Sequence, residues 1–173
     1  MDSLQVLSTA QNSLLGTLPI LGNILEYYVS NNQFSRIALS GEDFAVRHLD
    51  LSRNNLDGII PSNLGKATKL TTLNLANNNF RQSLPDEISK LVLLENLDIS
   101  SNDLTGALPD AALNGLSKLA TLVLSNNQWT GALPSSYGDL ESLKSLILTD
   151  TTNRGTVGSR LPSELGRLSN LGT

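Results

Sequence analysis

The chain of 173 residues contains no cysteine, a single tryptophan and a single histidine. The absence of cysteine excludes disulfides, zinc–thiolate sites and a cysteine nucleophile. No apolar run approaches the roughly 18 residues that a membrane-spanning helix needs. The start of the chain also lacks the basic and apolar segments of a signal peptide. We therefore expect no direct membrane contact within this segment.

Basic residues are few as well, and they form no run. The chain has 12 Lys and Arg against 16 Asp and Glu, which gives a net charge of −4. Nucleic acids and anionic membranes attract basic proteins, so this charge argues against both as partners. One histidine among scattered carboxylates also lacks the spacing of metal ligands. We expect no metal, no cofactor and no nucleic acid.

Leucine, by contrast, supplies 36 of the 173 residues and recurs with a fixed period. The clearest unit reads Leu-x-Leu-x-x-Asn-x-Leu and begins at Leu49, with further copies at Leu73, Leu97 and Leu122. Its asparagines stand at 54, 78, 102 and 127, so the steps are 24, 24 and 25 residues. Such a period is the signature of a repeat architecture. With weaker copies on both sides, the asparagine slot holds Asn12, Asn32, Asn54, Asn78, Asn102 and Asn127, and then Thr151 in the seventh repeat.

The second half of the repeat carries proline at one slot. The pattern Leu-x-Gly-x-Leu/Ile-Pro follows the asparagine, and Gln82 replaces the glycine in one copy. Proline disrupts helix interiors and central strands, whereas its fixed φ suits the start of a helix. The pattern therefore predicts a fixed turn before a short helical segment. All six prolines of the chain occupy this slot: Pro19, Pro61, Pro85, Pro109, Pro134 and Pro162.

This unit resembles the plant-type leucine-rich repeat, whose pattern includes Leu-x-Gly-x-Ile-Pro. It is similar to the ectodomains of leucine-rich-repeat receptor-like kinases and receptor-like proteins, and to polygalacturonase-inhibiting proteins. The resemblance covers about residues 4–171 and is strongest over 49–148. It implies an α/β solenoid, a right-handed superhelix with a concave parallel β-sheet and short helical or 3-10 segments on the convex side.

The domain prediction is a single solenoid segment over residues 1–173 with about seven repeats. Irregular repeats fill 1–48, regular repeats fill 49–148, and a lengthened last repeat fills 149–173. The lengthening, from Asn153 to Arg160, predicts a loop on one face. Solenoids need caps at their ends, because the terminal repeats would otherwise expose their core. The resemblance implies caps that contain cysteine. Because no such cap is visible, we expect the segment to belong to a longer protein.

Leucine and outward-facing residues alternate in each repeat, as a strand with one buried face requires. The asparagine that ends the strand has a short amide side chain. It is expected to bond backbone groups of its own turn and of the neighbouring repeat, and so to form a structural ladder. Replacing Asn78 by alanine then leaves buried backbone groups without partners, at a predicted cost of about 1–3 kcal/mol.

The outward strand positions form the predicted ligand-binding face. Neighbouring strands lie about 4.8 Å apart, so residues at one phase of the repeat stand side by side. The mixture of acid, amide and aromatic groups suits a polar peptide or an oligosaccharide, with Tyr28 as anchor. Val123 and Ile147 form a more apolar strip farther along, and the alternative is that these columns simply vary on a solvated face. The predicted site consists of Glu26, Tyr28, His48, Asp50, Arg53, Asn74 and Asp98.

Catalysis is not expected. His48 lies near Asp50 and serines, but these serines belong to a column that the repeat fixes. A flat sheet also lacks an oxyanion hole or a closed pocket. The leading hypothesis is a protein- or peptide-binding module of a cell-surface receptor-like protein, on the extracellular face of the plasma membrane. The alternatives are a cytoplasmic scaffold or adaptor, which the lack of cysteine and of Asn-x-Ser/Thr motifs favours, and an inhibitor of a cell-wall-degrading enzyme.

Overall fold

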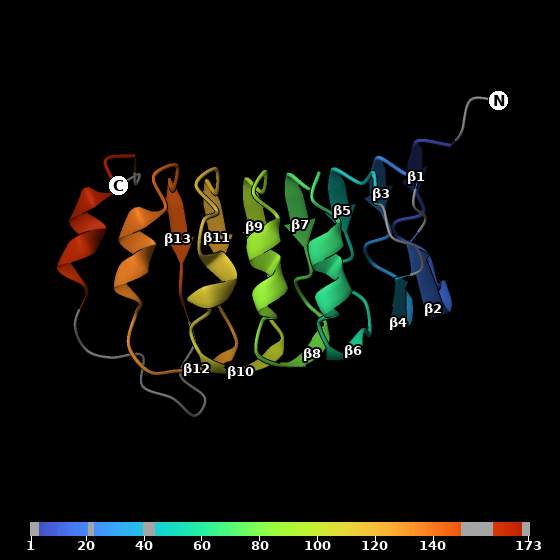
Figure 1. Cartoon of the computed structure of the whole chain (residues 1–173). Helices are drawn as coiled ribbons and strands as arrows, with labels where there is room; N and C mark the ends of the chain where they lie inside the picture. Colours follow the sequence, from blue (N-terminus) through green and yellow to red (C-terminus); the bar gives the residue numbers. More distant parts are fainter. Residues whose placement is uncertain (1–3, 21–22, 40–43, 150–160, 171–173) are drawn as a thin grey trace.

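A computed structural model describes residues 4–20, 23–39, 44–149 and 161–170. The chain winds in successive turns, which we call coils, and each coil contributes one strand to a long parallel sheet (Figure 1). Each inner strand pairs in parallel with the strands of the coils before and after it, and the first and last strands form the edges of the sheet. The predicted solenoid with a parallel sheet is therefore confirmed. The strands of this main sheet are β1 (Val6–Ser8), β3 (Glu26–Tyr28), β5 (His48–Asp50), β7 (Thr72–Asn74), β9 (Asn96–Asp98), β11 (Thr121–Val123) and β13 (Ser145–Ile147).

Short helical segments cover the side opposite the main sheet (Figure 1). Those of the described residues are all 3-10 helices, and four of them follow a proline of the repeat directly. Pro19 departs from this prediction, because it lies inside a strand rather than before a helix. None of these helices is long or apolar enough to cross a membrane. They are η1 (Ser62–Lys66), η2 (Asp86–Lys90), η3 (Ala111–Leu113), η4 (Ser135–Asp139) and η5 (Ser163–Arg167).

A second set of parallel strands lies between the asparagine slot and the proline, where the sequence predicted only a turn. These strands have three to seven residues each, too few to show a clear period, and three of the six contain glycine, which is depleted in strands. This part of the prediction was incomplete for that reason. One sheet joins β6 (Asp57–Ile59), β8 (Asn79–Gln82), β10 (Asp103–Ala107) and β12 (Gln128–Thr130), and a separate pair joins β2 (Leu15–Ile20) and β4 (Gln33–Leu39).

The core is a stripe of apolar side chains enclosed between these layers. Leucines of the repeat are completely buried, and Phe80 and Trp129 take the same slot as Leu56 and Leu104. The Trp129 indole N–H donates to the carbonyl of Leu124 at 2.9 Å, so its polar atom is satisfied. Leu146 and Leu148 of the seventh coil are only partly buried. Residues 40–43, the predicted loop 153–160 and Thr151 lie outside the described residues.

Candidate ligand-binding face

The asparagine slot fixes the edge of the main sheet. Asn78 Oδ1 accepts the backbone N–H of Leu56 at 3.1 Å, and its Nδ2 donates to the carbonyl of Leu51 at 3.0 Å, both in the preceding coil. The same Nδ2 reaches the carbonyls of Leu75 and Ala76 in its own turn. Each amide thus links two coils and closes one turn. Equivalent bonds are made by Asn32, Asn54, Asn102 and Asn127.

Asn12 is placed differently from the other predicted ladder residues. It is exposed, and its Nδ2 donates to the carbonyls of Thr9 and Ala10 in its own coil. The structure therefore gives Asn12 the turn-closing bonds of the slot, and the bonds between coils begin at Asn32.

Two rows of outward side chains cross the main sheet in exact register. The third residues of four successive strands, Tyr28, Asp50, Asn74 and Asp98, are partners of one another across the sheet. The first residues form a second row, in which Glu26 lies beside His48. All six of these side chains are half-buried. The structure therefore brings six of the seven predicted site residues together.

Arg53 is the predicted site residue that lies outside the strands. It is exposed and precedes the buried Asn54, at a turn where its backbone φ is 53°. This left-handed conformation recurs at the same slot of the repeat and turns the chain away from the sheet. Arg53 thus flanks the two rows at the carboxyl end of β5. The residues of this slot are Gln11, Asn31, Arg53, Asn77, Ser101 and Asn126.

Tyr28 is the aromatic group of the face, and its hydroxyl is held by a neighbour. The hydroxyl donates to Glu26 Oε2 at 3.3 Å. Partial burial, followed by the charge and hydrogen bond of Glu26 and the charge of Asp50, raises the pKa of the Tyr28 hydroxyl above its ordinary value. The side chain is therefore a neutral phenol at physiological pH, with a ring and a polar tip for a partner.

The acids and the amide of the third-residue row also stabilise their own turns. Asp50 Oδ1 accepts the backbone N–H of Ser52, and Asn74 Oδ1 accepts that of Ala76, both at 3.0 Å. Asp98 does the same with Ser100. Sequence reasoning missed this role, although an Asx side chain two residues before a free N–H is a known turn pattern. In each of these side chains Oδ1 accepts the hydrogen bond of the turn, and the second polar atom is left for other contacts.

The formally charged side chains within the two rows are all acidic. The two rows contain Glu26, Asp50 and Asp98, and none of their described positions is a lysine or arginine. Farther along the sheet, Val123 and Ile147 are partners in register, and Ile147 is 40% exposed. The predicted apolar strip therefore adjoins the polar rows on the same sheet.

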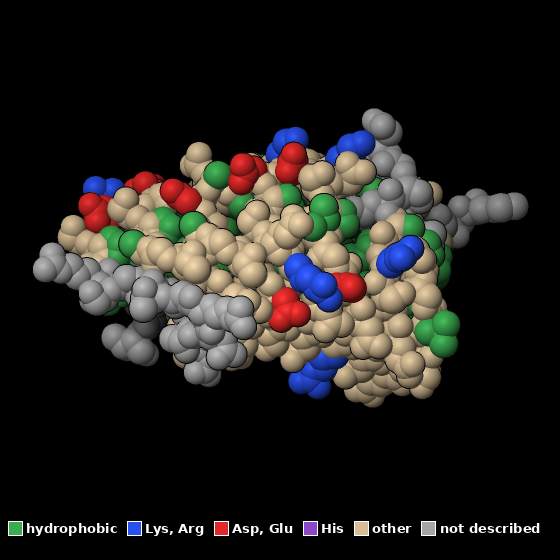
Figure 2. Space-filling model, turned by 90° about the horizontal axis from the view of Figure 1, so that it is seen from below, with side chains coloured by type: hydrophobic (Ala, Val, Ile, Leu, Met, Phe, Trp, Pro, Cys, Tyr) green, Lys and Arg blue, Asp and Glu red, His purple; other side chains and the backbone are tan. Residues whose placement is uncertain are grey.

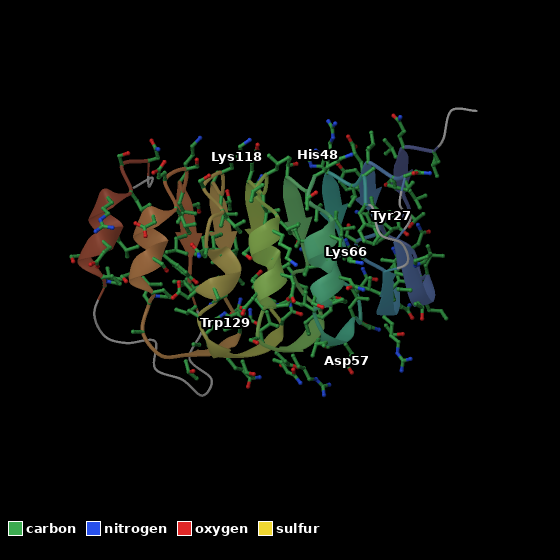
Figure 3. All side chains as sticks on the ribbon, in the orientation of Figure 1. Tyr27, His48, Asp57, Lys66, Lys118 and Trp129 are labelled. Carbon is green, nitrogen blue, oxygen red and sulfur yellow. The ribbon has the colours of Figure 1, made fainter. Side chains whose placement is uncertain are left out.

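The rims of the stack and the side with the second sheet differ from the main sheet in where their charged side chains lie. His48 and Lys118 lie at one rim of the stack, and Asp57 and Trp129 lie toward the opposite rim (Figure 3). Seen from below, charged side chains gather mainly along one edge, and the remaining ones are scattered over this side (Figure 2). One ion pair there joins Arg81 to Asp57 at 3.2 Å between exposed side chains, which contributes little to stability.

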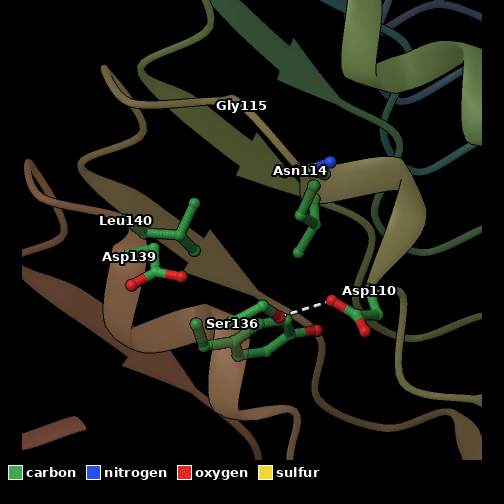
Figure 4. Close-up of a pocket in the computed structure, with 8 residues that line it drawn as sticks. Asp110, Asn114, Gly115, Ser136, Asp139 and Leu140 are labelled. Carbon is green, nitrogen blue, oxygen red and sulfur yellow. Dashed lines mark hydrogen bonds between the residues drawn. The ribbon is translucent and has the colours of Figure 1, made fainter. Parts of the chain in front are cut away.

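A small pocket lies between η3 and η4, where Ser136 donates to Asp110 (Figure 4). The Tyr137 hydroxyl beneath it donates to the carbonyl of Pro109 at 3.1 Å. Burial, with a smaller effect of the Asp110 charge, raises the pKa of Tyr137 far above its ordinary value. Because Tyr137 stays neutral and its hydroxyl already donates to a backbone carbonyl, its role is packing rather than proton transfer. Among the described residues, no group of three or more histidines and carboxylates is placed to hold a metal.

Comparison with known proteins identifies the family. Residues 27–173 match the model of the leucine-rich repeat region, and the chain belongs to this family. The predicted resemblance to plant-type leucine-rich-repeat proteins is confirmed. No curated protein gives a significant match.

Solved structures of plant receptors share this fold. The PEPR1–AtPEP1 structure is 28% identical with a TM-score of 0.88, over 97% of this chain and 24% of that chain. The ectodomain of the receptor kinase GASSHO1/SCHENGEN3 from Arabidopsis thaliana, in complex with CASPARIAN STRIP INTEGRITY FACTOR 2, is 32% identical with a TM-score of 0.84, over 97% and 20%. The Arabidopsis receptor kinase HAESA, with the peptide hormone IDA and the co-receptor SERK1, is 25% identical with a TM-score of 0.70, over 97% and 33%. The chain thus spans a third or less of the length of these proteins.

Proposed function

We propose that the chain is a protein- or peptide-binding recognition module of a cell-surface receptor-like protein, acting on the extracellular face of the plasma membrane. The observation that carries the proposal is the pair of in-register rows on β3, β5, β7 and β9. Their half-buried side chains offer a flat, polar surface with one aromatic anchor. The similarity to a receptor crystallised with a peptide hormone supports the same proposal.

We propose further that residues 1–173 form one solenoid segment of about seven repeats within a longer ectodomain. The support is the share of the related receptors that it spans, 24%, 20% and 33%. In this setting the module supplies part of the binding surface, and signalling belongs to other parts of the protein. We assign the rows no catalysis, because among the described residues no hydrogen bond joins His48 to a hydroxyl group of the rows, as an activated nucleophile would require.

The proposed contact is with an extended peptide that crosses the strands. Tyr28 packs its ring against an apolar or cationic side chain. Asp50 and Asp98 accept hydrogen bonds from the ligand through the oxygen that their own turns leave over, and Asn74 can also donate. An oligosaccharide offers hydroxyl donors and stacking faces to the same groups, so the test includes both ligand types.

Selection from a phage-displayed random peptide library, with a glycan array in parallel, tests the proposal on the purified chain. Tyr28→Ala combined with Asp50→Asn is expected to abolish binding of the selected ligands, a loss of at least tenfold in affinity. Asparagine keeps the Oδ1 acceptor for the Ser52 N–H, as Asn74 shows in the next coil, so the fold is retained. The matched control is Arg81→Ala with Thr105→Ala on the second sheet, which should leave binding unchanged.

Two results contradict the proposal. One is a ligand whose affinity is insensitive to the main-sheet variant but falls with the second-sheet control. The other is a full-length protein that stays in the cytoplasm when its location is followed with an epitope tag in plant cells. The second result would favour an intracellular adaptor instead.

A further inference from the structure

The turn after η3 belongs to the repeat that is one residue longer than the two before it. The step from Asn102 to Asn127 is 25 residues, and η3 has three residues where η1, η2 and η4 have five. Asn114 and Gly115 follow η3 in an exposed turn, where the φ of Gly115 is 81°. This is the one position of the sequence at which glycine directly follows asparagine. A Cβ at Gly115 would meet nothing within 4 Å, so the space around the turn is open.

The reactivity of this turn depends on the backbone nitrogen of Gly115. Its N–H donates to no acceptor among the described residues, and glycine has no side chain to hinder a close approach. Attack of this nitrogen on the side-chain amide carbon of Asn114 needs a rotation about the Asn114 ψ, which is 128°. The hydrogen bonds that close the turn, from the Asn114 N–H to Ala111 and from the Leu116 N–H to Leu113, are long at 3.3 and 3.2 Å. They therefore oppose the rotation only weakly.

The asparagine ladder protects other exposed asparagines from the same attack. Asn55 is exposed like Asn114, but the N–H of the next residue, Leu56, donates to Asn78 Oδ1 at 3.1 Å. Asn79 is followed by an N–H that is held in the same way one repeat later. The buried ladder amides themselves donate to backbone carbonyls of two coils. The structure therefore sets Asn114 apart from these asparagines.

We propose that Asn114–Gly115 is a site of spontaneous deamidation in the folded protein. The Gly115 nitrogen forms a bond to Cγ of Asn114, the bond from Cγ to Nδ2 breaks, and Nδ2 leaves as ammonia with the proton of the Gly115 N–H. The product is a cyclic succinimide. Water then opens the ring at Cγ, which gives aspartate, or at the main-chain carbonyl carbon, which gives isoaspartate. This inference is independent of the proposed function.

Both products change the convex side of this coil. Each adds a carboxylate at the pocket between η3 and η4, which is already lined by Asp110 and Asp139 (Figure 4). Isoaspartate also adds one carbon to the main chain between Leu113 and Leu116, which are both buried. The hydrogen bond that joins these two leucines is then strained or lost. We expect the Tm of the isoaspartate form to fall by about 2–4 °C.

Storage of the folded protein in mildly alkaline buffer, followed by peptide mapping with mass spectrometry, tests the proposal. The peptide that contains position 114 is expected to lose ammonia first and to yield both aspartate and isoaspartate, which electron-transfer fragmentation distinguishes. Peptides that contain Asn55 and Asn79 are internal controls and should stay unchanged over the same period. In Asn114→Gln the attack has to close a larger ring, so conversion in this turn should be lost, while Tm stays that of the unmodified chain.

The variant Asn114→Asp separates the added charge from the longer main chain. Its Tm should stay closer to that of the unmodified chain than the Tm of the isoaspartate form does. Asn12, which is exposed and precedes the small residue Ser13, is the competing site. Conversion of Asn12 or Asn55 before Asn114 would overturn the proposal. A position 114 that converts in urea but stays intact in the folded protein would overturn it as well.

Discussion

Single amides and single backbone angles set the geometry of each coil. From Asn32 onward the slot asparagines are buried polar residues whose oxygens and nitrogens all have partners, and each links two coils. One residue earlier, the chain adopts a left-handed φ of 53–58° at six successive repeats. Asparagine tolerates this conformation better than most residues, and it occupies the slot at Asn31, Asn77 and Asn126. Gln11, Arg53 and Ser101 hold the same slot with a small backbone strain, which the surrounding hydrogen bonds of the turn offset.

Asn78→Ala removes an acceptor from the Leu56 N–H and a donor from the Leu51 carbonyl, both in the buried interface between coils. We expect a loss of about 1–3 kcal/mol in unfolding free energy, because buried backbone groups lose their partners. Chemical denaturation with circular dichroism measures it. Asn79→Ala at the exposed neighbouring position is the control, and equal midpoints for the two variants would contradict the role assigned to Asn78.

Gln82 occupies a slot that the other regular repeats give to glycine. Its φ is 67°, and Gly58, Gly106 and Gly131 have φ of 91°, 95° and 84° at the same place. Positive φ strains residues with a Cβ, so Gln82→Gly should stabilise the protein by about 1 kcal/mol and raise Tm by about 2–4 °C. Gly106→Gln should shift Tm by a similar amount in the opposite direction. A lower Tm for Gln82→Gly in thermal unfolding would show that the glutamine side chain contributes contacts instead.

At the scale of elements, glycine controls how closely the 3-10 segments stack. A Cβ at Gly65 in η1 would overlap the backbone carbonyl of Glu87 in η2, and one at Gly138 in η4 would overlap that of Glu164 in η5. Backbone atoms cannot move aside as a flexible side chain can, so these glycines set the spacing between coils on the convex side.

Gly65→Ala should therefore cost about 1–3 kcal/mol, the range for overpacking a tight contact. Gly166→Ala in η5 is the matched control, since a Cβ there meets nothing within 4 Å. Thermal unfolding of the two variants compares them directly. A Tm for Gly65→Ala as high as that of Gly166→Ala would mean that neighbouring coils separate without cost.

The elements differ in how well the sequence predicts them. The main strands follow from alternating leucines and the 24-residue period, and Pro61, Pro85, Pro134 and Pro162 mark the start of 3-10 segments. The second sheet does not follow from either signal, because β6 and β12 have three residues each, too few to establish an alternation of polarity. Its strands form because the equivalent extended segments of adjacent coils lie side by side and hydrogen bond. This pairing depends on the stacking of the coils and not on the sequence of any one segment.

At the scale of the whole molecule, the repeat places distant residues side by side without any local signal. Tyr28, Asp50, Asn74 and Asp98 are neighbours because their phase in the repeat is the same, and this could be read from the sequence. Two features were not predicted. The hydrogen bond from Ser52 N–H to Asp50 and the turn conformation of Arg53 recur with the repeat, but they depend on backbone angles that the spacing of the leucines does not reveal. The identity of a ligand depends on the side chains of several coils together, so the repeat period does not predict it either.

Site-specific photocrosslinking tests the central claim, that ligands bind across the main sheet. A benzoylphenylalanine is introduced in place of Thr72, which lies beside His48 in the first-residue row, and separately in place of Thr105 on β10 of the second sheet. The account predicts that a ligand selected on the intact protein is captured from position 72 and not from position 105, with the crosslink mapped by mass spectrometry. Capture from position 105 alone would contradict it and would place the binding surface on the second sheet.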